Sequence, residues 1–295
     1  MQNNGFYTNK TLNVGGKLID LHTPRVMGIL NITPDSFYDG GKFTGEDSMS
    51  RHVSEMVEAG ADFIDVGGAS SRPSAHLVPE EEERRRVLPA IRFLVKKFPG
   101  ILISVDTFRA SIAREAVGEG ASMVNDISGG EQDPQLFETV ASLQVPYVLM
   151  HMRGTPQTMS ELTAYNDLIK ELTDYFHQKI FQLHQAGVRD IILDPGFGFA
   201  KTREQNFELL HQLEHFRILG LPILAGLSRK SMIGKTLNIR PEDALNGTTV
   251  LNTIALMKSA AILRVHDVKE AVECIKLFLK TSGNSAPAEA FKTMH

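Results

Sequence analysis

Short apolar runs that end in a polar residue recur along the chain, and each is followed by a segment with helical spacing. Runs rich in Val, Ile and Leu are typical of strands covered on both faces, and their alternation with helices is typical of a parallel sheet. The eight runs occupy residues 25–31, 63–68, 102–106, 122–126, 147–151, 191–194, 222–226 and 261–266. Because the composition does not change between these units, they predict a single (β/α)8 TIM barrel, an α/β fold, rather than two domains.

The segments that flank the eight units predict a short extension and a tail. Residues 11–21 contain Gly15-Gly16 between short alternating stretches, which indicates a hairpin that caps the bottom of the barrel within residues 1–24. The barrel is expected over residues 25–280, and the tail of residues 281–295 is expected to fray.

Helix signals lie between the strands. Asp133 followed by Pro134 is typical of an N-cap and a first-turn proline. Pro89 interrupts the helix that starts near residue 80, so we expect a kink or two shorter helices there. The charged run EEEERRR of residues 80–86 predicts a solvated helix face.

Composition and charge narrow the possible partners. The 31 Lys and Arg residues against 35 Asp and Glu residues give a formal net charge of −4, which argues against a nucleic acid partner because phosphate neutralisation needs a basic face. A single cysteine, Cys274, excludes an internal disulfide and a Cys-rich zinc site. No apolar run approaches the ~18 residues of a membrane span, so we expect no membrane partner and a cytoplasmic location.

Active sites of (β/α)8 barrels form where the strands end, so the polar residues at those ends are the candidates for chemistry. They are Asn31, Asp65, Asp106, Asn125, Asp126, His151, Asp194, Arg264 and His266. Any one of them could be a helix cap or turn former, since Asp and Asn favour such positions. Together, Asp106 and Asp194 would converge over one mouth, where carboxylates and amides can bind a heterocycle with several N–H donors.

A second candidate cluster comes from the last strand. Arg264 and His266 are two positions apart in an extended run, so both point to the same side. Asn31 becomes their neighbour when the barrel closes, and helix N-termini at the same mouth add partial positive charge, so the cluster predicts an anion site. The alternative is that Arg264 bridges to a nearby carboxylate while His266 packs beside it.

Three segments have the composition of active-site loops: TPDSFYDGGKF, GASSRPSA and LSRKSMIGK. Their Ser, Arg, Lys and Gly residues suit phosphate or carboxylate contacts, although each alone could be a solvated surface loop. The segment DPGFGFAKT lacks the G-x-x-x-x-G-K-[ST] spacing of a phosphate-binding loop, which excludes a nucleoside triphosphatase with such a loop.

Eight segments, in order and across nearly the whole chain, resemble the dihydropteroate synthase family: MGILNITPDSFYDGG, IDVGGASSRPSA, SVDTFRASIAREAV, VNDISGG, LMHMRGTPQTM, LDPGFGFAKT, GLSRKSMIG and RVHDV. The resemblance implies a transferase of folate biosynthesis that joins 4-aminobenzoate to 6-hydroxymethyl-7,8-dihydropterin diphosphate. The products would be 7,8-dihydropteroate and pyrophosphate, with Mg²⁺ assisting. It also implies a homodimer and a sulfonamide target.

The resemblance carries roles to individual residues by motif. It implies that the pterin is bound by Asp106, Asn125, Asp194 and Lys230. It implies that the diphosphate is bound by Asn31, Ser71, Arg264 and His266, with Asn31 as the protein ligand of Mg²⁺. It implies that the aminobenzoate side is formed by Arg72, Pro73, Phe199 and Ser228. The residues expected to be catalytic are Arg264, His266, Lys230 and Asp106.

The implied chemistry needs no protein nucleophile, because an electron-rich dihydropterin can expel diphosphate to leave a stabilised cationic methylene. Catalysis would then consist of stabilising the departing anion and positioning the amine. The sequence departs from the family in the second loop, with Ala69 where Glu is frequent and Ser74 where Gly is common, while Ser71 keeps a hydroxyl. The missing carboxylate at Ala69 bears on loop closure and on sulfonamide affinity.

Two other functions remain open from the sequence. A pterin-binding methyltransferase would share the barrel and the residues Asp106, Asn125 and Asp194, but would not need the diphosphate cluster. A catalytically silent pterin-binding paralogue would keep the pocket and lose turnover. Against it stand the intact residues Asn31, Arg72, Lys230, Arg264 and His266.

Overall fold

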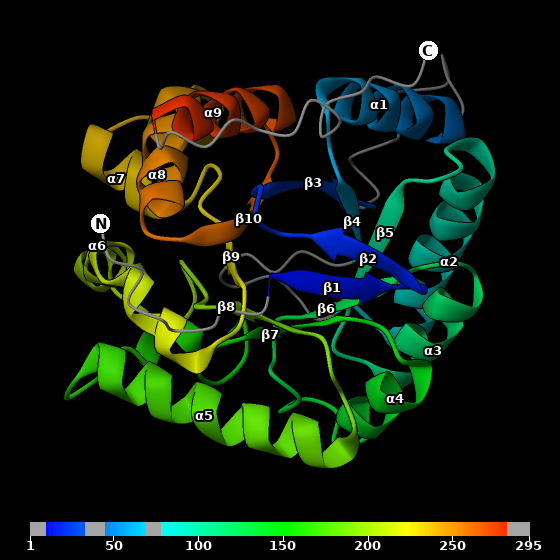
Figure 1. The fold of residues 1–295 in the computed structure, drawn as a ribbon, viewed down its shortest axis with the longest axis horizontal. Coiled ribbons are helices and arrows are strands. Elements are labelled where there is room, and N and C mark those ends of the chain that lie inside the picture. The colour runs from blue at the N-terminus through cyan, green and yellow to red at the C-terminus, as the bar shows by residue number, and fades with distance from the viewer. Residues whose placement is uncertain (1–9, 33–44, 69–77, 282–295) are drawn as a thin grey trace.

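Eight parallel strands close into a barrel in the computed structural model, which describes residues 10–32, 45–68 and 78–281 (Figure 1). Their order around the barrel is β10-β3-β4-β5-β6-β7-β8-β9, so each strand pairs with the next in the chain and the last closes on the first. The strands are β3 (Arg25–Asn31), β4 (Phe63–Gly67), β5 (Leu102–Asp106), β6 (Met123–Asp126), β7 (Tyr147–Met150), β8 (Ile191–Asp194), β9 (Ile223–Ala225) and β10 (Ala260–Val265). The predicted (β/α)8 barrel is therefore confirmed.

Helices surround the barrel on its outer face (Figure 1). They are α1 (Gly45–Ala59), α2 (Glu80–Lys97), α3 (Ala110–Gly118), α4 (Leu136–Leu143), α5 (Leu168–Ala186), α6 (Arg203–His211), α7 (Ser231–Leu237), α8 (Leu245–Met257) and α9 (Val268–Thr281), with short 3₁₀ turns at η1 (Met159–Glu161), η2 (Leu213–Leu219) and η3 (Pro241–Asp243). Their apolar faces and the outward-facing strand residues form the larger hydrophobic core. Among these helices none combines the length and the apolar character that a membrane span requires.

A hairpin of β1 (Thr11–Val14) and β2 (Lys17–Asp20) precedes the barrel, as the alternating pattern predicted. Gly15 and Gly16 have φ of +57° and +84°, the left-handed conformations that a tight hairpin turn requires. Leu12 and Ile19 pack into a second core made by residues at the starts of the strands, such as Phe63. The hairpin therefore closes the amino-terminal end of the barrel and leaves the opposite end for a site.

The expected division at Pro89 into two shorter helices was wrong, and the alternative of a kink stays a prediction. Helix α2 runs unbroken from Glu80 to Lys97 with Pro89 inside it, because the residues next to the proline, Leu88 and Ala90, are buried. That packing outweighs the loss of one backbone hydrogen bond.

Asp133 bonds to the starts of two helices. Its Oδ1 accepts a hydrogen bond of 3.0 Å from the N–H of Gln135, in the turn that leads into α4 at Leu136, as predicted for an N-cap. Its Oδ2 also accepts a hydrogen bond of 2.8 Å from the N–H of Ala110 at the start of α3. The carboxyl-terminal helix α9 continues through Thr281, so this first residue of the predicted tail is helical, and residues 282–295 lie outside the described part of the chain.

Candidate active site

Polar side chains gather at the carboxyl ends of the barrel strands, opposite the hairpin. Strand register places Asn31 beside Gly67, Gly67 beside Asp106 and Asp106 beside Asn125. A Cβ at Gly67 would lie 3.6 Å from Asn31 Oδ1 and 3.4 Å from Asp106 Cβ, so this glycine leaves the space between the two side chains open. Three of the predicted site residues are thus neighbours on adjoining strands.

Arg264 on β10 is the centre of a hydrogen-bond network inside the mouth. Its Nε donates to Asp65 Oδ2 at 2.7 Å and its Nη2 donates to Asp106 Oδ2 at 2.8 Å. Asn125 Nδ2 donates to the same Asp65 oxygen at 2.9 Å. The network joins β4, β5, β6 and β10. Arg264 therefore bridges to nearby carboxylates, which was the alternative to an anion site in the sequence analysis. Among the described residues, Asp65 Oδ1 is buried without a partner.

The charge of this network depends on Asp106. Burial raises the pKa of Asp106 to about 7, the carboxylates of Asp65, Asp126 and Asp194 add to the rise, and the Arg264 guanidinium opposes it. The raised pKa favours the protonated form of Asp106, which can donate as well as accept a hydrogen bond.

Asp194 ends β8 and begins a tight turn. Its Oδ1 accepts a hydrogen bond of 2.8 Å from the N–H of Gly196, while burial raises its pKa. Five residues later, the buried Phe199 ring lies 4.4 Å from Lys230 Nζ. Burial lowers the pKa of Lys230 to about 8, with Asp194 and Asp106 opposing the shift, so Lys230 interacts with both carboxylates.

The loop after β9 is held against the end of β10. Ser228 Oγ lies 3.1 Å from His266 Nδ1 and accepts a hydrogen bond of 3.2 Å from the His266 backbone N–H. Arg229 makes a bidentate contact with Asp267 at 3.0 and 2.6 Å. Ser228, predicted on the aminobenzoate side, therefore contacts a member of the predicted diphosphate set.

Two further strand-end residues have internal partners. Asp126 is fully buried and accepts hydrogen bonds from the N–H groups of Ser128 and Gly130 and from the Tyr147 hydroxyl, so it is a turn former. His151 is buried against Lys201, whose Nζ lies 3.1 Å from His151 Nδ1.

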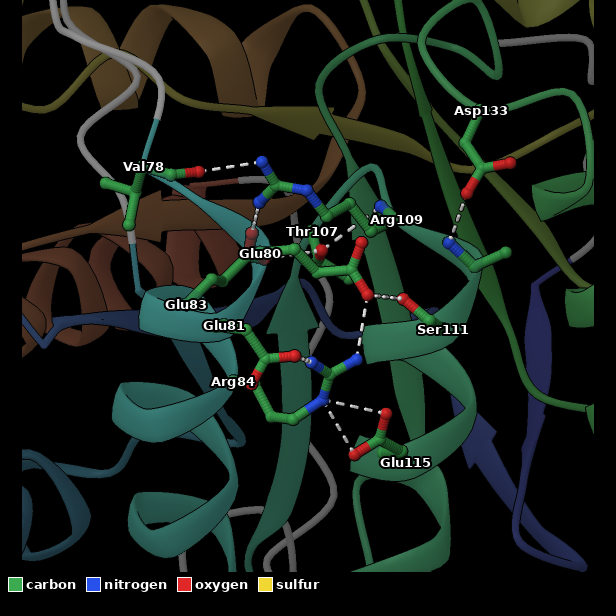
Figure 2. A network of polar contacts seen from close by, with 11 residues as sticks. Val78, Glu80, Glu81, Glu83, Arg84, Thr107, Arg109, Ser111, Glu115 and Asp133 are labelled. Carbon is green, nitrogen blue, oxygen red and sulfur yellow. Dashed lines mark hydrogen bonds and ion pairs between the residues drawn. The ribbon is translucent and has the colours of Figure 1, made fainter.

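A buried carboxylate on α2 bonds to the segment that follows β5 (Figure 2). The prediction that residues 80–86 form a solvated helix face did not anticipate it. Glu83 is 2% exposed, and it accepts a hydrogen bond of 2.6 Å from Thr107 and an ion-paired hydrogen bond from Arg109. Arg109 also donates to the Val78 carbonyl at 2.7 Å. Because Thr107 directly follows Asp106, Glu83 fixes the segment on which Asp106 stands.

Three predicted site residues, Ser71, Arg72 and Pro73, lie outside the described residues, as do Ala69 and Ser74. In residues 10–32, 45–68 and 78–281, no group of three or more His, Cys, Asp or Glu side chains could hold a metal ion.

Sequence reasoning assigned no role to Asp65, Glu83 or Lys201. Asp65 was named among the polar candidates near the strand ends, but the structure places it in the middle of β4, where it bonds to Arg264. Glu83 and Lys201 bond to residues up to 50 positions away in the chain, and no local pattern marks such partners. The mouth as a whole offers acceptors for N–H donors, an apolar ring and two cations, which suits a flat nitrogen heterocycle with an anionic substituent.

The comparisons with known proteins agree with this chemistry. The family model described as pterin binding enzyme matches residues 27–266. Dihydropteroate synthase of Escherichia coli (strain K12) is 44% identical over 264 residues, which covers 89% of this chain and 93% of that protein. Dihydropteroate synthase of Synechocystis is 46% identical over 255 residues, covering 85% of this chain and 88% of that protein.

Solved structures give the same relationship. A Yersinia pestis dihydropteroate synthase in a sulfonamide drug complex superposes with a TM-score of 0.87 at 41% identity, covering 92% of this chain and 99% of that one. A Xanthomonas albilineans dihydropteroate synthase in complex with 7,8-dihydropteroate superposes with a TM-score of 0.83 at 38% identity, covering 93% of this chain and 100% of that one.

Proposed function

The chain belongs to the dihydropteroate synthase family of pterin-binding enzymes, and we propose that the polar residues at its barrel mouth form three adjoining subsites for the reaction of that family. The chain is a transferase that joins 4-aminobenzoate to 6-hydroxymethyl-7,8-dihydropterin diphosphate, with 7,8-dihydropteroate and pyrophosphate as products. The observation that carries the assignment of subsites is the buried network of Asp65, Asp106, Asn125 and Arg264.

The pterin is bound by Asp106, Asn125, Asp194 and Lys230 in this proposal. The amino group and the adjacent ring N–H of a pterin form a guanidine-like edge, which pairs with one carboxylate through two charge-assisted hydrogen bonds. Asp194 is the candidate for this pairing, because it is buried and already oriented by Gly196. Phe199 with the Lys230 side chain across it provides a wall for the flat ring.

The diphosphate is bound by Arg264, His266 and Asn31, together with Ser71. Helix α9 begins at Val268, two residues after His266, so its N-terminus adds partial positive charge near this subsite. Protonation of Asp106, favoured by its raised pKa, would leave less of the Arg264 charge compensated and so favour an anion nearby.

Asn31 is the candidate protein ligand of Mg²⁺. Mg²⁺ binds oxygen ligands, keeps several waters and is commonly held by few protein groups plus substrate phosphates. The amide oxygen of Asn31, which faces the space above Gly67, fits that requirement. When bound, Mg²⁺ would neutralise charge on the departing diphosphate.

The aminobenzoate lies between Phe199 and Ser228, with Arg72 and Pro73 completing the subsite in this proposal. The chemistry requires no nucleophile from the protein. Arg264 and His266 stabilise the negative charge that develops on the leaving diphosphate, while Asp106 keeps Arg264 oriented and Asp194 holds the pterin. The amine nitrogen then attacks the cationic methylene, so that a C–N bond replaces the C–O bond to the diphosphate, and the proton that the nitrogen loses passes to the released pyrophosphate or to solvent.

A two-substrate turnover assay tests this function. Purified protein is given the pterin diphosphate, 4-aminobenzoate and Mg²⁺, and pyrophosphate and dihydropteroate are quantified. We expect both products in equal amounts, and none when either substrate or Mg²⁺ is omitted. Binding of the pterin diphosphate without turnover would indicate a silent pterin-binding protein, and methyl transfer to or from a pterin would indicate the methyltransferase instead.

The proposal includes a homodimer in the cytoplasm. Its support is an apolar surface on α7 and α8, where Leu237, Val250 and Met257 are 52%, 49% and 68% exposed. Cys274, the single cysteine, is buried as a free thiol, which suits a reducing compartment.

A further inference from the structure

Lys201 belongs to none of the three subsites, yet among the described lysines it is the buried one, with 8% of its surface exposed. Buried lysines are rare unless they are paired with an opposite charge. The hydrogen bonds of its Nζ, however, go to neutral acceptors: the Gly196 carbonyl, the Phe199 carbonyl and His151 Nδ1, each at 3.1 Å. An ammonium has three N–H donors, and here each has one acceptor.

These contacts connect the turn that follows β8 to the residue that follows β7. The turn is tightly curved, because Gly196, Gly198 and Ala200 have φ of +72°, +80° and +47°. A Cβ at Gly196 would lie 2.1 Å from the His151 carbonyl oxygen, so the turn approaches the residue after β7 too closely for any side chain at this position. Ala200 is not a glycine, and its left-handed backbone is a strained conformation that the surrounding contacts must maintain.

The same geometry fixes the proton of His151. A lysine ammonium has no acceptor, so His151 Nδ1 accepts the hydrogen bond and the neutral ring carries its proton on Nε2. Burial, together with the charges of Lys201 and Arg153, lowers the pKa of His151 well below its usual value, which keeps the ring neutral.

We propose that Lys201 is a positioning residue of the pterin subsite, whose three hydrogen bonds hold the 195–200 turn so that Asp194 and Phe199 keep their separation. This inference rests on the proposed roles of Asp194 and Phe199. Burial also lowers the pKa of Lys201 to about 7, opposed by the charge of Asp194, so the ammonium with its three N–H donors is the main form only below that pH.

Two substitutions at this position test the proposal by calorimetric titration with 6-hydroxymethyl-7,8-dihydropterin diphosphate. Lys201→Met removes all three donors, and we expect the dissociation constant to rise about tenfold, the equivalent of losing one net hydrogen bond of ~1.4 kcal/mol. Lys201→Gln keeps two N–H donors and should lie between Met and the native protein. Lys170→Met, which removes an exposed lysine on α5, is the matched control and should leave the dissociation constant unchanged.

A second measurement separates positioning from general destabilisation. In the ligand-free native protein, the ring ¹⁵N shifts of His151, assigned with His151→Gln, should report the Nε2–H form, and Lys201→Met should change them. A Lys201→Met protein that melts like the native one, binds the pterin diphosphate with native affinity and keeps the His151 shifts would overturn the proposal. If native protein itself shows no turnover while the shifts change as expected, the proposed function fails and the internal contact stands.

Discussion

Asp194 is oriented before any ligand arrives, because Gly196 holds its Oδ1 and the pairing of β7 with β8 holds its backbone. Asp194→Asn keeps the shape but replaces one acceptor by a donor, which would face the N–H groups of the pterin. Two charge-assisted hydrogen bonds are lost, so we expect affinity for the pterin diphosphate to fall about 100-fold, or ~3 kcal/mol. Isothermal titration measures this.

The matched control for that variant is Asp190→Asn. Asp190 lies at the other end of the same strand segment, where it accepts a hydrogen bond from the hairpin residue Asn13. The affinity of the Asp190→Asn protein for the pterin diphosphate should equal that of the native protein. Native affinity in Asp194→Asn would show that the guanidine-like edge binds elsewhere.

The lowered pKa of Lys230 predicts that substrate binding depends on pH. Burial lowers its pKa to about 8, so the ammonium is present below pH 8 and is lost as the pH rises through that value. The KM for the pterin diphosphate should therefore rise between about pH 7 and pH 9, a window centred on that pKa. Lys230→Arg stays charged over this pH range, so its KM should change less with pH, even where the KM itself is higher. An equally steep rise of KM in both proteins would assign the effect to another group.

Glu83 on α2 couples this helix to the start of α3 through its ion pair with Arg109 (Figure 2). Glu83→Gln removes the buried charge that pairs with Arg109, and breaking a buried pair typically costs ~3 kcal/mol because the partner stays buried. We expect the free energy of unfolding, measured in urea, to fall by about that amount.

Glu81→Gln is the control for this loss. Glu81 stands two residues earlier on the same helix, its side chain is 77% exposed, and it pairs with Arg84. Exposed pairs contribute ~0–1 kcal/mol, so this variant should unfold close to the native protein. Equal losses for the two variants would mean that the burial of Glu83 contributes nothing beyond an ordinary surface pair.

The same elements separate what the sequence could predict from what it could not. Strands such as β4 are buried on both faces, so their apolar runs are continuous and their polar ends mark the mouth. Glu83 lies in a run of seven charged residues, which is typical of a solvated helix face. Only its partners Thr107 and Arg109, brought close by the closed barrel, make it buried. Lys201 was missed for the same reason.

At the scale of the whole molecule, the two ends of the barrel have different roles. The hairpin closes one end with apolar side chains, while polar strand ends and helix N-termini form the other. The outward faces of the helices lie away from the mouth, so an exposed apolar surface there is available for association between copies of the chain.

The surface on α7 and α8 gives the prediction for the assembly. Val250 and Met257 are seven residues apart and so share one helix face, and a symmetric dimer would bring this face of each copy against the other. Light scattering should give a mass twice the 32.6 kDa of one chain, and the double variant Val250→Glu with Met257→Glu should return the mass to that of one chain. Phe181→Glu, a similar exposed change on α5, which Figure 1 places apart from α8, should leave the dimer intact. A dimer that survives the α8 changes would place the interface on another face, whereas dissociation by the α5 change alone would place it on α5.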